Sequence, residues 1–193
     1  MPDPRTQASA AGPAPDPRLS VERAADLGEE DLHALAEAAT AAILDGGGFG
    51  WLAPPGRGEL ERYFRGVLLV PERELYVGRM DGAIVAAAQL VRPPRNNEAQ
   101  AFAAWFMHAF TAPYARGHGV ARLVLERVEE GARARGYQIL NLDVRETQHA
   151  AIALYESLGF LRWGTHPAYA RVDGRTLAGH YYYKLLQPRG RAS

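Results

Sequence analysis

The sequence predicts one α/β domain, built on a mixed β-sheet with helices on both of its faces. The chain has 193 residues, 47% of them hydrophobic, which is enough for one domain with a substantial core. Segments with the 3.6-residue period of amphipathic helices alternate with segments that read as strands. Turn signals separate them in the order α-α-β-β-β-α-β-α-β-β, and this order implies that strands from both halves share one sheet.

The N-terminal part predicts a tail followed by two helices. Residues 1–19 are rich in Pro and Ala and lack the apolar core of a signal peptide, so we expect a disordered tail; an ordered arm docked on the body is the alternative. Apolar side chains recur at helical spacing over residues 29–44 and again over about 58–68. A glycine-rich loop, "DGGGFGWLAP", joins the two helices.

The rest of the chain alternates strands and helices up to a short tail at 189–193, so that residues 20–188 form the domain. A hairpin with its turn at Asp81-Gly82 is the strongest short-range signal. A long apolar strand, closed by Pro113, follows it. The remaining predicted elements are a helix from about 120, a buried strand at 138–145, a helix at 147–160 that Gly159 ends, and two strands around a turn at Asp173-Gly174.

Composition excludes several classes of function. Twenty-two basic and twenty-two acidic residues give a formal net charge of zero, which disfavours nucleic acid and anionic membranes as partners. The absence of cysteine removes thiolate nucleophiles and disulfides, and the six histidines lack the spacing of metal ligands, so we expect no metal. No apolar run is long enough to span a membrane, and we expect a cytoplasmic protein.

Gly117 and Gly119 stand where a helix should begin, in the stretch "ARGHGVARLVLERVEEGARARG". A strand, a glycine-rich turn and a helix N-terminus together predict an anion site, because unpaired N–H groups converge there and no side chain obstructs a phosphate. The turn lacks the lysine of a Walker loop, and Arg122 occupies the third glycine position of a dinucleotide-binding fingerprint. A tight turn without a ligand remains the alternative.

Two motifs resemble those of the GNAT superfamily of N-acetyltransferases. Residues 116–121 fit the pyrophosphate-binding pattern [RQ]-x-x-G-x-[GA], and "TQHAAIALYESLGF" resembles the second signature, NxxAIxLYxxxGF. The resemblance implies a GNAT-like fold, with a central mixed sheet of six to seven strands flanked by helices, and an acetyl-CoA-dependent enzyme. The loop "DGGGFGWLAP" and the C-terminal segment from residue 164 look like the tabtoxin-resistance type of the superfamily.

The resemblance also implies which residues hold acetyl-CoA. Backbone groups at the end of the long strand would align the pantetheine arm and polarise the acetyl carbonyl, and backbone N–H groups of the turn would hold the pyrophosphate. Gln148 stands where the family commonly has Asn, as a pantetheine contact; a helix cap or a solvent-facing side chain is the alternative. The implied coenzyme-binding residues are Ala109, Phe110, Thr111, Arg116, Gly117, His118, Gly119, Val120, Ala121 and Gln148.

Tyr155 occupies the position of the family's tyrosine, whose hydroxyl can protonate the departing thiolate; a core residue is the alternative. An aliphatic amine is mostly protonated at neutral pH, so a base must remove its proton. His108 is the preferred candidate, because an unperturbed imidazole titrates near neutrality; a core histidine with satisfied hydrogen bonds is the alternative. Glu146 and His149 are further candidates, and the alternation of Asp143 with its apolar neighbours predicts that it faces the opposite side.

Such proteins usually build the acceptor site from the loop between the first two helices, which here implies Phe49, Trp51 and Tyr63. The predicted function is acetyl transfer from acetyl-CoA to a primary amine of a small molecule by direct attack in a ternary complex. The alternatives are a protein N-terminal or lysine acetyltransferase and a non-catalytic acyl-CoA sensor. The sequence leaves open whether the protein acts as a homodimer.

Overall fold

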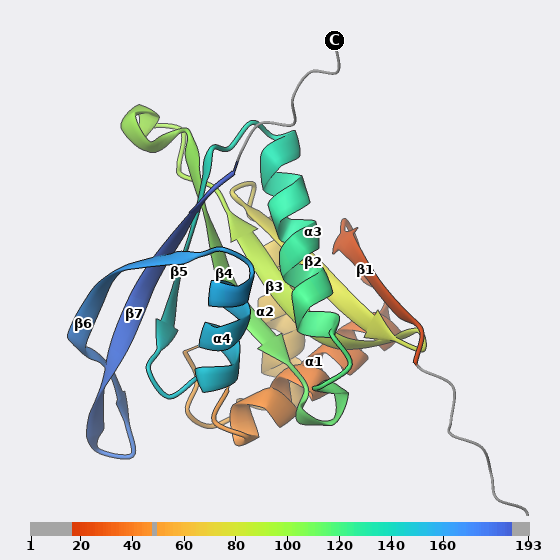
Figure 1. Ribbon diagram of the computed structural model, residues 1–193. Helices are drawn as coiled ribbons and strands as arrows, with labels where there is room; N and C mark the ends of the chain where they lie inside the picture. Colours follow the sequence, from red (N-terminus) through yellow and green to blue (C-terminus); the bar gives the residue numbers. More distant parts are fainter. Residues whose placement is uncertain (1–16, 48–49, 187–193) are drawn as a thin grey trace, which may run out of the picture.

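A computed structural model of the chain, shown in Figure 1, describes residues 17–47 and 50–186. Seven strands form one mixed sheet in the order β1-β2-β3-β4-β5-β7-β6. Among these strands, β4 and β5 alone pair in parallel. The elements are β1 Leu19–Ala24, α1 Glu29–Leu44, α2 Arg57–Leu69, β2 Arg73–Met80, β3 Ala83–Val91, β4 Ala103–Thr111, α3 Val120–Ala134, β5 Ile139–Arg145, α4 His149–Ser157, β6 Leu161–Val172 and β7 Arg175–Leu185.

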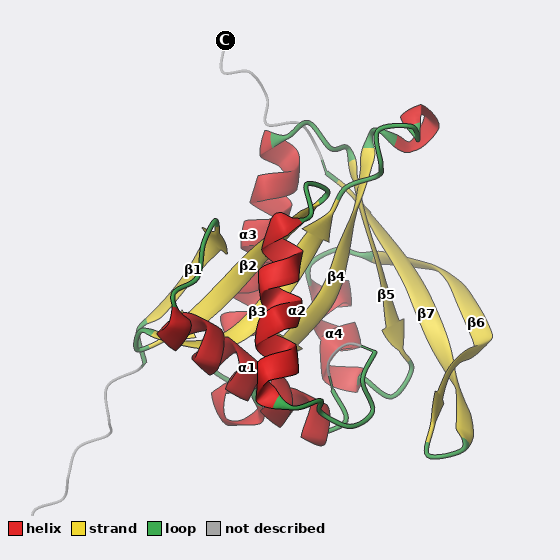
Figure 2. Cartoon of the chain, turned by 180° about the vertical axis from the view of Figure 1, so that it is seen from behind, coloured by secondary structure: helices red, strands yellow, loops and turns green. Residues whose placement is uncertain are grey.

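The helices form a layer on each face of the sheet, as the order of elements predicts. Figure 1 views the face that carries α3 and α4, and Figure 2 shows α1 and α2 on the other face. Each layer encloses its own cluster of buried apolar residues. Gly78 lets α3 approach the sheet closely, because a Cβ there would lie 2.8 Å from methyl carbons of Val120 and Val124. No helix in residues 17–47 and 50–186 is long and apolar enough to cross a bilayer.

The predicted order of elements lacked β1, an edge strand that pairs antiparallel with β2. Of the predicted tail, residues 1–16 lie outside the described residues, and Leu19 already pairs with Met80. The segment has only six residues, and Leu19 and Val21 are half-buried against the core, so its alternation is too short to distinguish it from a tail in the sequence. Contacts distant in sequence hold it, including the ion pair between Glu22 and Arg79. The C-terminal tail at 189–193 also lies outside the described residues.

Two irregularities of β4 position the functional site. β4 pairs with β5 only at Ala103 to Trp105, opposite Ile139 to Asn141, although both strands continue beyond these residues. The sheet therefore opens between them. Toward the same end of β4, the pairing with β3 shifts by one residue, and His108 adopts a left-handed φ of 53°. This is a β-bulge, which bends a strand and redirects its side chains.

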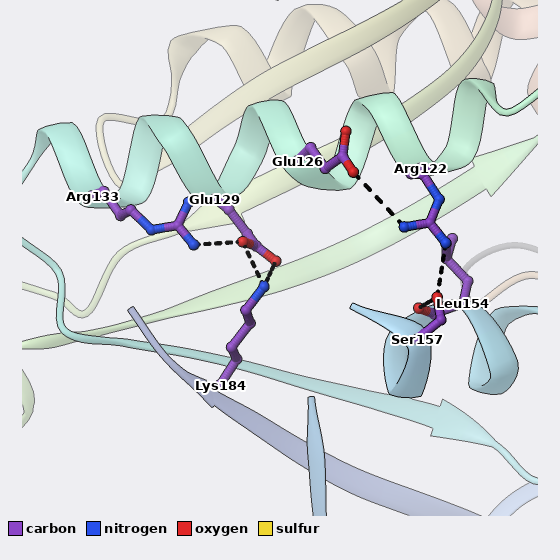
Figure 3. A network of polar contacts seen from close by, with 7 residues as sticks. All are labelled: Arg122, Glu126, Glu129, Arg133, Leu154, Ser157 and Lys184. Atoms are coloured by element: carbon purple, nitrogen blue, oxygen red, sulfur yellow. Dashed lines mark hydrogen bonds and ion pairs between the residues drawn. The ribbon is translucent and has the colours of Figure 1, made fainter. Parts of the chain in front are cut away.

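A network of polar contacts shown in Figure 3 ties α3 to β7. The Nζ of Lys184, the one lysine in the chain, lies 2.7 and 2.8 Å from the carboxylate oxygens of Glu129, and Arg133 binds the same carboxylate at 2.7 Å. Glu129 is buried, and this charge is compensated by both cations.

We expect Glu129→Gln to lower the free energy of unfolding by roughly 1 to 3 kcal/mol, since it leaves Lys184 and Arg133 without their carboxylate in a largely buried place. Urea denaturation measures the change. Glu130→Gln is the control: it removes the same charge from an exposed pair with Arg127 and should change the free energy of unfolding by less than about 0.5 kcal/mol. Equal losses in the two variants would contradict this account of the network.

Candidate functional site

Two cavities meet where the sheet opens between β4 and β5. The larger has a volume of about 630 Å³ and the smaller about 490 Å³. They share five lining residues, Phe106, Ala109, Gln148, Ala151 and Tyr155. The two cavities therefore meet at these five residues, which come from β4 and from α4 with its N-cap residue.

The turn before α3 forms one wall of the larger cavity. Gly117 and Gly119 have left-handed φ values of 83° and 86°, and no heavy atom lies within 4 Å of a Cβ built at either one. Gly119 is the N-cap of α3 and contributes no side-chain cap, so the first N–H groups of the helix need another acceptor. A backbone of this kind, with open space before it, fits a phosphate.

The structure brings most of the predicted coenzyme-binding residues to this cavity. The exception is His118, whose side chain is exposed and does not line the cavity. The wall of the larger cavity includes Ala109, Phe110, Thr111, Arg116, Gly117, Gly119, Val120, Ala121 and Gln148.

Arg116 and Gln148 contact the loop that follows α1. The guanidinium of Arg116 pairs with the carboxylate of Asp45, and the side-chain amide of Gln148 donates a hydrogen bond to the carbonyl of Gly46 at 3.0 Å. Gln148 precedes α4 but makes no side-chain cap. Both side chains therefore link the larger cavity to the loop between the first two helices. This connection joins segments that are distant in the sequence, and the sequence did not reveal it.

Tyr155 lies at the junction of the two cavities, on α4. Its ring packs among aromatic neighbours, 6.1 Å from both Phe106 and Phe160, and 8% of the residue is exposed. Burial, and secondly the negative charge of Asp143, raise the pKa of Tyr155 well above its usual range. Within the described residues its hydroxyl has no hydrogen-bond partner. This group keeps its proton at neutral pH and borders both cavities.

His108 lines the smaller cavity only, from the bulge of β4. Burial, with a further contribution from the positive charge of Arg73, lowers the pKa of His108 below its usual range, while Asp143 acts in the opposite direction. The imidazole is therefore neutral near pH 7, which is the form that accepts a proton.

Of the three predicted acceptor residues, the structure describes two, and one of these lies in the wall of the smaller cavity. Trp51 lines the smaller cavity, whereas Tyr63 does not. The ring of Tyr63 packs edge-on against Trp51 with 5.1 Å between centroids, and its hydroxyl accepts a hydrogen bond from the buried Gln89 at 3.0 Å. Tyr63 therefore supports the wall from behind. Phe49 lies outside the described residues.

The other base candidates lie outside the smaller cavity. Glu146 accepts a hydrogen bond from the backbone N–H of Ala178 at 2.8 Å, which fastens the end of β5 to β7. His149 is exposed and lines the larger cavity. Within the described residues no group of three or more His, Asp or Glu side chains could hold a metal ion.

Sequence reasoning missed four polar or charged residues of the smaller cavity, Asp143, Arg145, Tyr169 and Arg171. The prediction that Asp143 faces the opposite side is wrong, because it lines the same cavity as His108. Asp143 does alternate with the buried Leu142 and Val144, but the cavity lies on its own side of the sheet. The alternation of β5 would have identified Asp143 as a cavity residue if the face of the sheet that carries the cavity had been known. Tyr169 carries no comparable signal.

Comparisons with known proteins find similar acetyltransferases. The model of the acetyltransferase (GNAT) family matches residues 38–160. An uncharacterized N-acetyltransferase of the hisH-hisA intergenic region of Azospirillum brasilense is 59% identical over 130 residues, 67% of this chain and 77% of that protein. The N-alpha-acetyltransferase RimI of Mycobacterium tuberculosis is 34% identical over 104 residues, 51% of this chain and 60% of that protein.

Among solved structures, the putative acetyltransferase yncA from Salmonella typhimurium, determined with acetyl-CoA, has a TM-score of 0.72 at 18% identity. The match covers 91% of this chain and 98% of that one. At this identity the likeness shows the shared fold.

Proposed function

The chain belongs to the acetyltransferase (GNAT) family and is an acyltransferase that uses acetyl-CoA, and from this premise we propose that it acetylates the primary amine of a small molecule by direct attack in a ternary complex. The observation that supports the proposal is the meeting of two cavities at Tyr155. Acetyl-CoA would occupy the larger cavity and the amine the smaller one, so that the two reactants meet at the opening between β4 and β5.

The residues of the larger cavity fit the coenzyme. The open glycine turn and the N-terminus of α3 would hold the pyrophosphate, and the backbone of Ala109 to Thr111 would align the pantetheine and polarise the acetyl carbonyl. When bound, acetyl-CoA supplies an activated thioester. The proposed roles of Arg116 and Gln148 are to fix this end of the cavity against the loop after α1.

In the proposed reaction the ammonium group of the acceptor first loses one proton to solvent, and the neutral imidazole of His108 accepts the second proton as the amine attacks. Tyr155, which holds its proton, then donates it to the departing sulfur. The chain contains no cysteine, so a cysteine-bound acyl-enzyme does not arise. The acceptor therefore takes the acetyl group directly.

Trp51, Tyr169 and neighbouring side chains enclose the smaller cavity, whose volume of about 490 Å³ suits a small amine. Protein acetylation is the second candidate, because one relative is called an N-alpha-acetyltransferase. A panel assay of thiol release from acetyl-CoA separates the two. We expect turnover with small primary amines or amino acids. Faster turnover with peptide N-termini or peptide lysines would replace the proposal, and binding of acetyl-CoA without thiol release with any acceptor would favour the sensor alternative.

His108→Asn tests the proposed base. Asparagine tolerates the left-handed backbone of the bulge, so the fold should survive. We expect kcat to fall by about a hundredfold or more at pH 7.5. Because the pKa of His108 is lowered, the kcat of the wild type should fall on acidification only below pH 6.5, the ordinary pKa of histidine. This fall in kcat should be absent from the variant. An unchanged pH profile of kcat would exclude His108 as the base.

Two finer assignments belong to the same proposal. The tabtoxin-resistance type is supported by the sequence of the loop after α1 and of the segment from residue 164. A cytoplasmic location is proposed because the co-substrate of the family is acetyl-CoA.

A further inference from the structure

A polar pair in the smaller cavity has no part in the mechanism above. The hydroxyl of Tyr169, on β6, donates a hydrogen bond to the carboxylate of Asp143, on β5. Strand β7 lies between these two strands in the sheet. Two strand spacings amount to roughly 9 to 10 Å, so the tyrosine side chain reaches across a whole strand.

Two features of the backbone make this reach possible. β6 pairs His166 with Gly179 and Ala170 with Leu177, so three residues of β6 stand opposite one residue of β7 and the strand bulges. At Gly179 a Cβ would lie 2.1 Å from Cγ of Tyr169. The ring therefore lies directly over the glycine, and any larger residue at position 179 would displace it.

The carboxylate that Tyr169 holds is half-buried in the cavity wall. Within residues 17–47 and 50–186 no cation pairs with Asp143. A partly buried carboxylate without a cationic partner is costly, which makes a cationic ligand favourable at this place. The faces of Trp51 and Tyr169, which line the same cavity, also favour a cation.

This carboxylate lies near the reacting groups. Its charge raises the pKa of Tyr155 and opposes the lowering of the pKa of His108, so its field acts on both. Arg145 and Arg171 also line the cavity. Arg145 projects to the same face of β5 as Asp143, two residues further along.

We propose that Asp143, oriented by Tyr169 across Gly179, is the site that binds the ammonium group of the acceptor. The inference rests on the proposed function, since an acceptor amine enters the cavity as a cation at neutral pH. Asp143 is the binding residue and Tyr169 a positioning residue, and the bulge of β6 together with Gly179 allows the contact.

The test is a titration of the protein with n-butylammonium, followed by NMR through the indole N–H of Trp51. The solution contains no acetyl-CoA, so the result is independent of acetyl transfer. We expect saturable binding of n-butylammonium and none of the neutral 1-butanol. Asp143→Asn and Tyr169→Phe should weaken binding by at least tenfold.

Gly179→Ala should weaken binding to a similar degree, because it displaces the ring of Tyr169 without removing a polar group. Gly164→Ala, on the neighbouring strand β6, is the matched control: a Cβ there meets no atom within 4 Å, and binding should be unchanged. In steady-state assays the three site variants should raise the KM of the amine about tenfold and leave the KM of acetyl-CoA within twofold. Equal binding of 1-butanol, or unchanged affinity in Asp143→Asn and Tyr169→Phe, would overturn the inference.

Discussion

Tyr155→Phe is expected to lower kcat by about a hundredfold to ten-thousandfold, the usual contribution of a general acid. This corresponds to roughly 3 to 5 kcal/mol of activation free energy. The ring that packs between Phe106 and Phe160 is retained, so the fold and the Kd of acetyl-CoA should be unchanged. Only the hydroxyl at the junction of the cavities is lost. The measurement is steady-state kinetics with an acceptor from the panel, beside calorimetric binding of acetyl-CoA.

Tyr182→Phe is the control for this variant. It removes a hydroxyl from a neighbouring buried ring, 6.5 Å from Tyr155, that lines neither cavity and donates its hydrogen bond to Glu156. Its kcat should stay within threefold of the wild type. A similarly small effect of Tyr155→Phe would exclude Tyr155 as an essential acid. Weaker acetyl-CoA binding together with a lower melting temperature would instead make Tyr155 a packing residue.

Gly119→Val is expected to abolish stabilisation by acetyl-CoA. At a hundred times the Kd, bound acetyl-CoA should stabilise the wild type by about 2.7 kcal/mol. Valine cannot adopt the left-handed φ of 86° without strain, and its side chain would project into the open space where the pyrophosphate is proposed to bind. Thermal denaturation with and without acetyl-CoA measures the difference.

Gly136→Val separates strain from loss of the site. Gly136 follows the other end of α3, with a φ of 82° and equally open surroundings, and it lines neither cavity. Its variant should lose stability without ligand, as Gly119→Val does, but retain the full shift with acetyl-CoA. A full shift in Gly119→Val would show that the turn does not hold the coenzyme.

The helices were predictable because each buries one face, which imposes a period on the sequence, and most strands were predictable because turn signals bound them. The spacing of Leu32, Leu35 and Ile43 predicts α1, and the turn at Asp81-Gly82 predicts the β2–β3 hairpin, as the structure confirms. β1 is six residues long and is not bounded by a turn signal in the sequence, and its place depends on its pairing with β2. An element whose own residues carry a periodic pattern or a turn signal could be predicted from the sequence. An element whose position depends on pairing with a distant strand could not.

The same distinction applies to the site. The coenzyme turn is one continuous segment, so its motif led to the residues that line the larger cavity. The smaller cavity is assembled from β4, β5, β6 and the loop after α1, and its geometry depends on a bulge and on the missing side chain of Gly179. The contact between Tyr169 and Asp143 depends on both, and neither leaves a local pattern in the sequence.

The central claim is that acetyl-CoA and the amine occupy the two cavities together and react directly. Initial rates of thiol release, measured while both substrates are varied, test it most directly. Direct attack in a ternary complex predicts double-reciprocal plots that intersect, and no exchange of labelled CoA into acetyl-CoA in the absence of the amine. Parallel plots, with exchange in the absence of the amine, would contradict the claim, because they would show that the acetyl group first transfers to the protein.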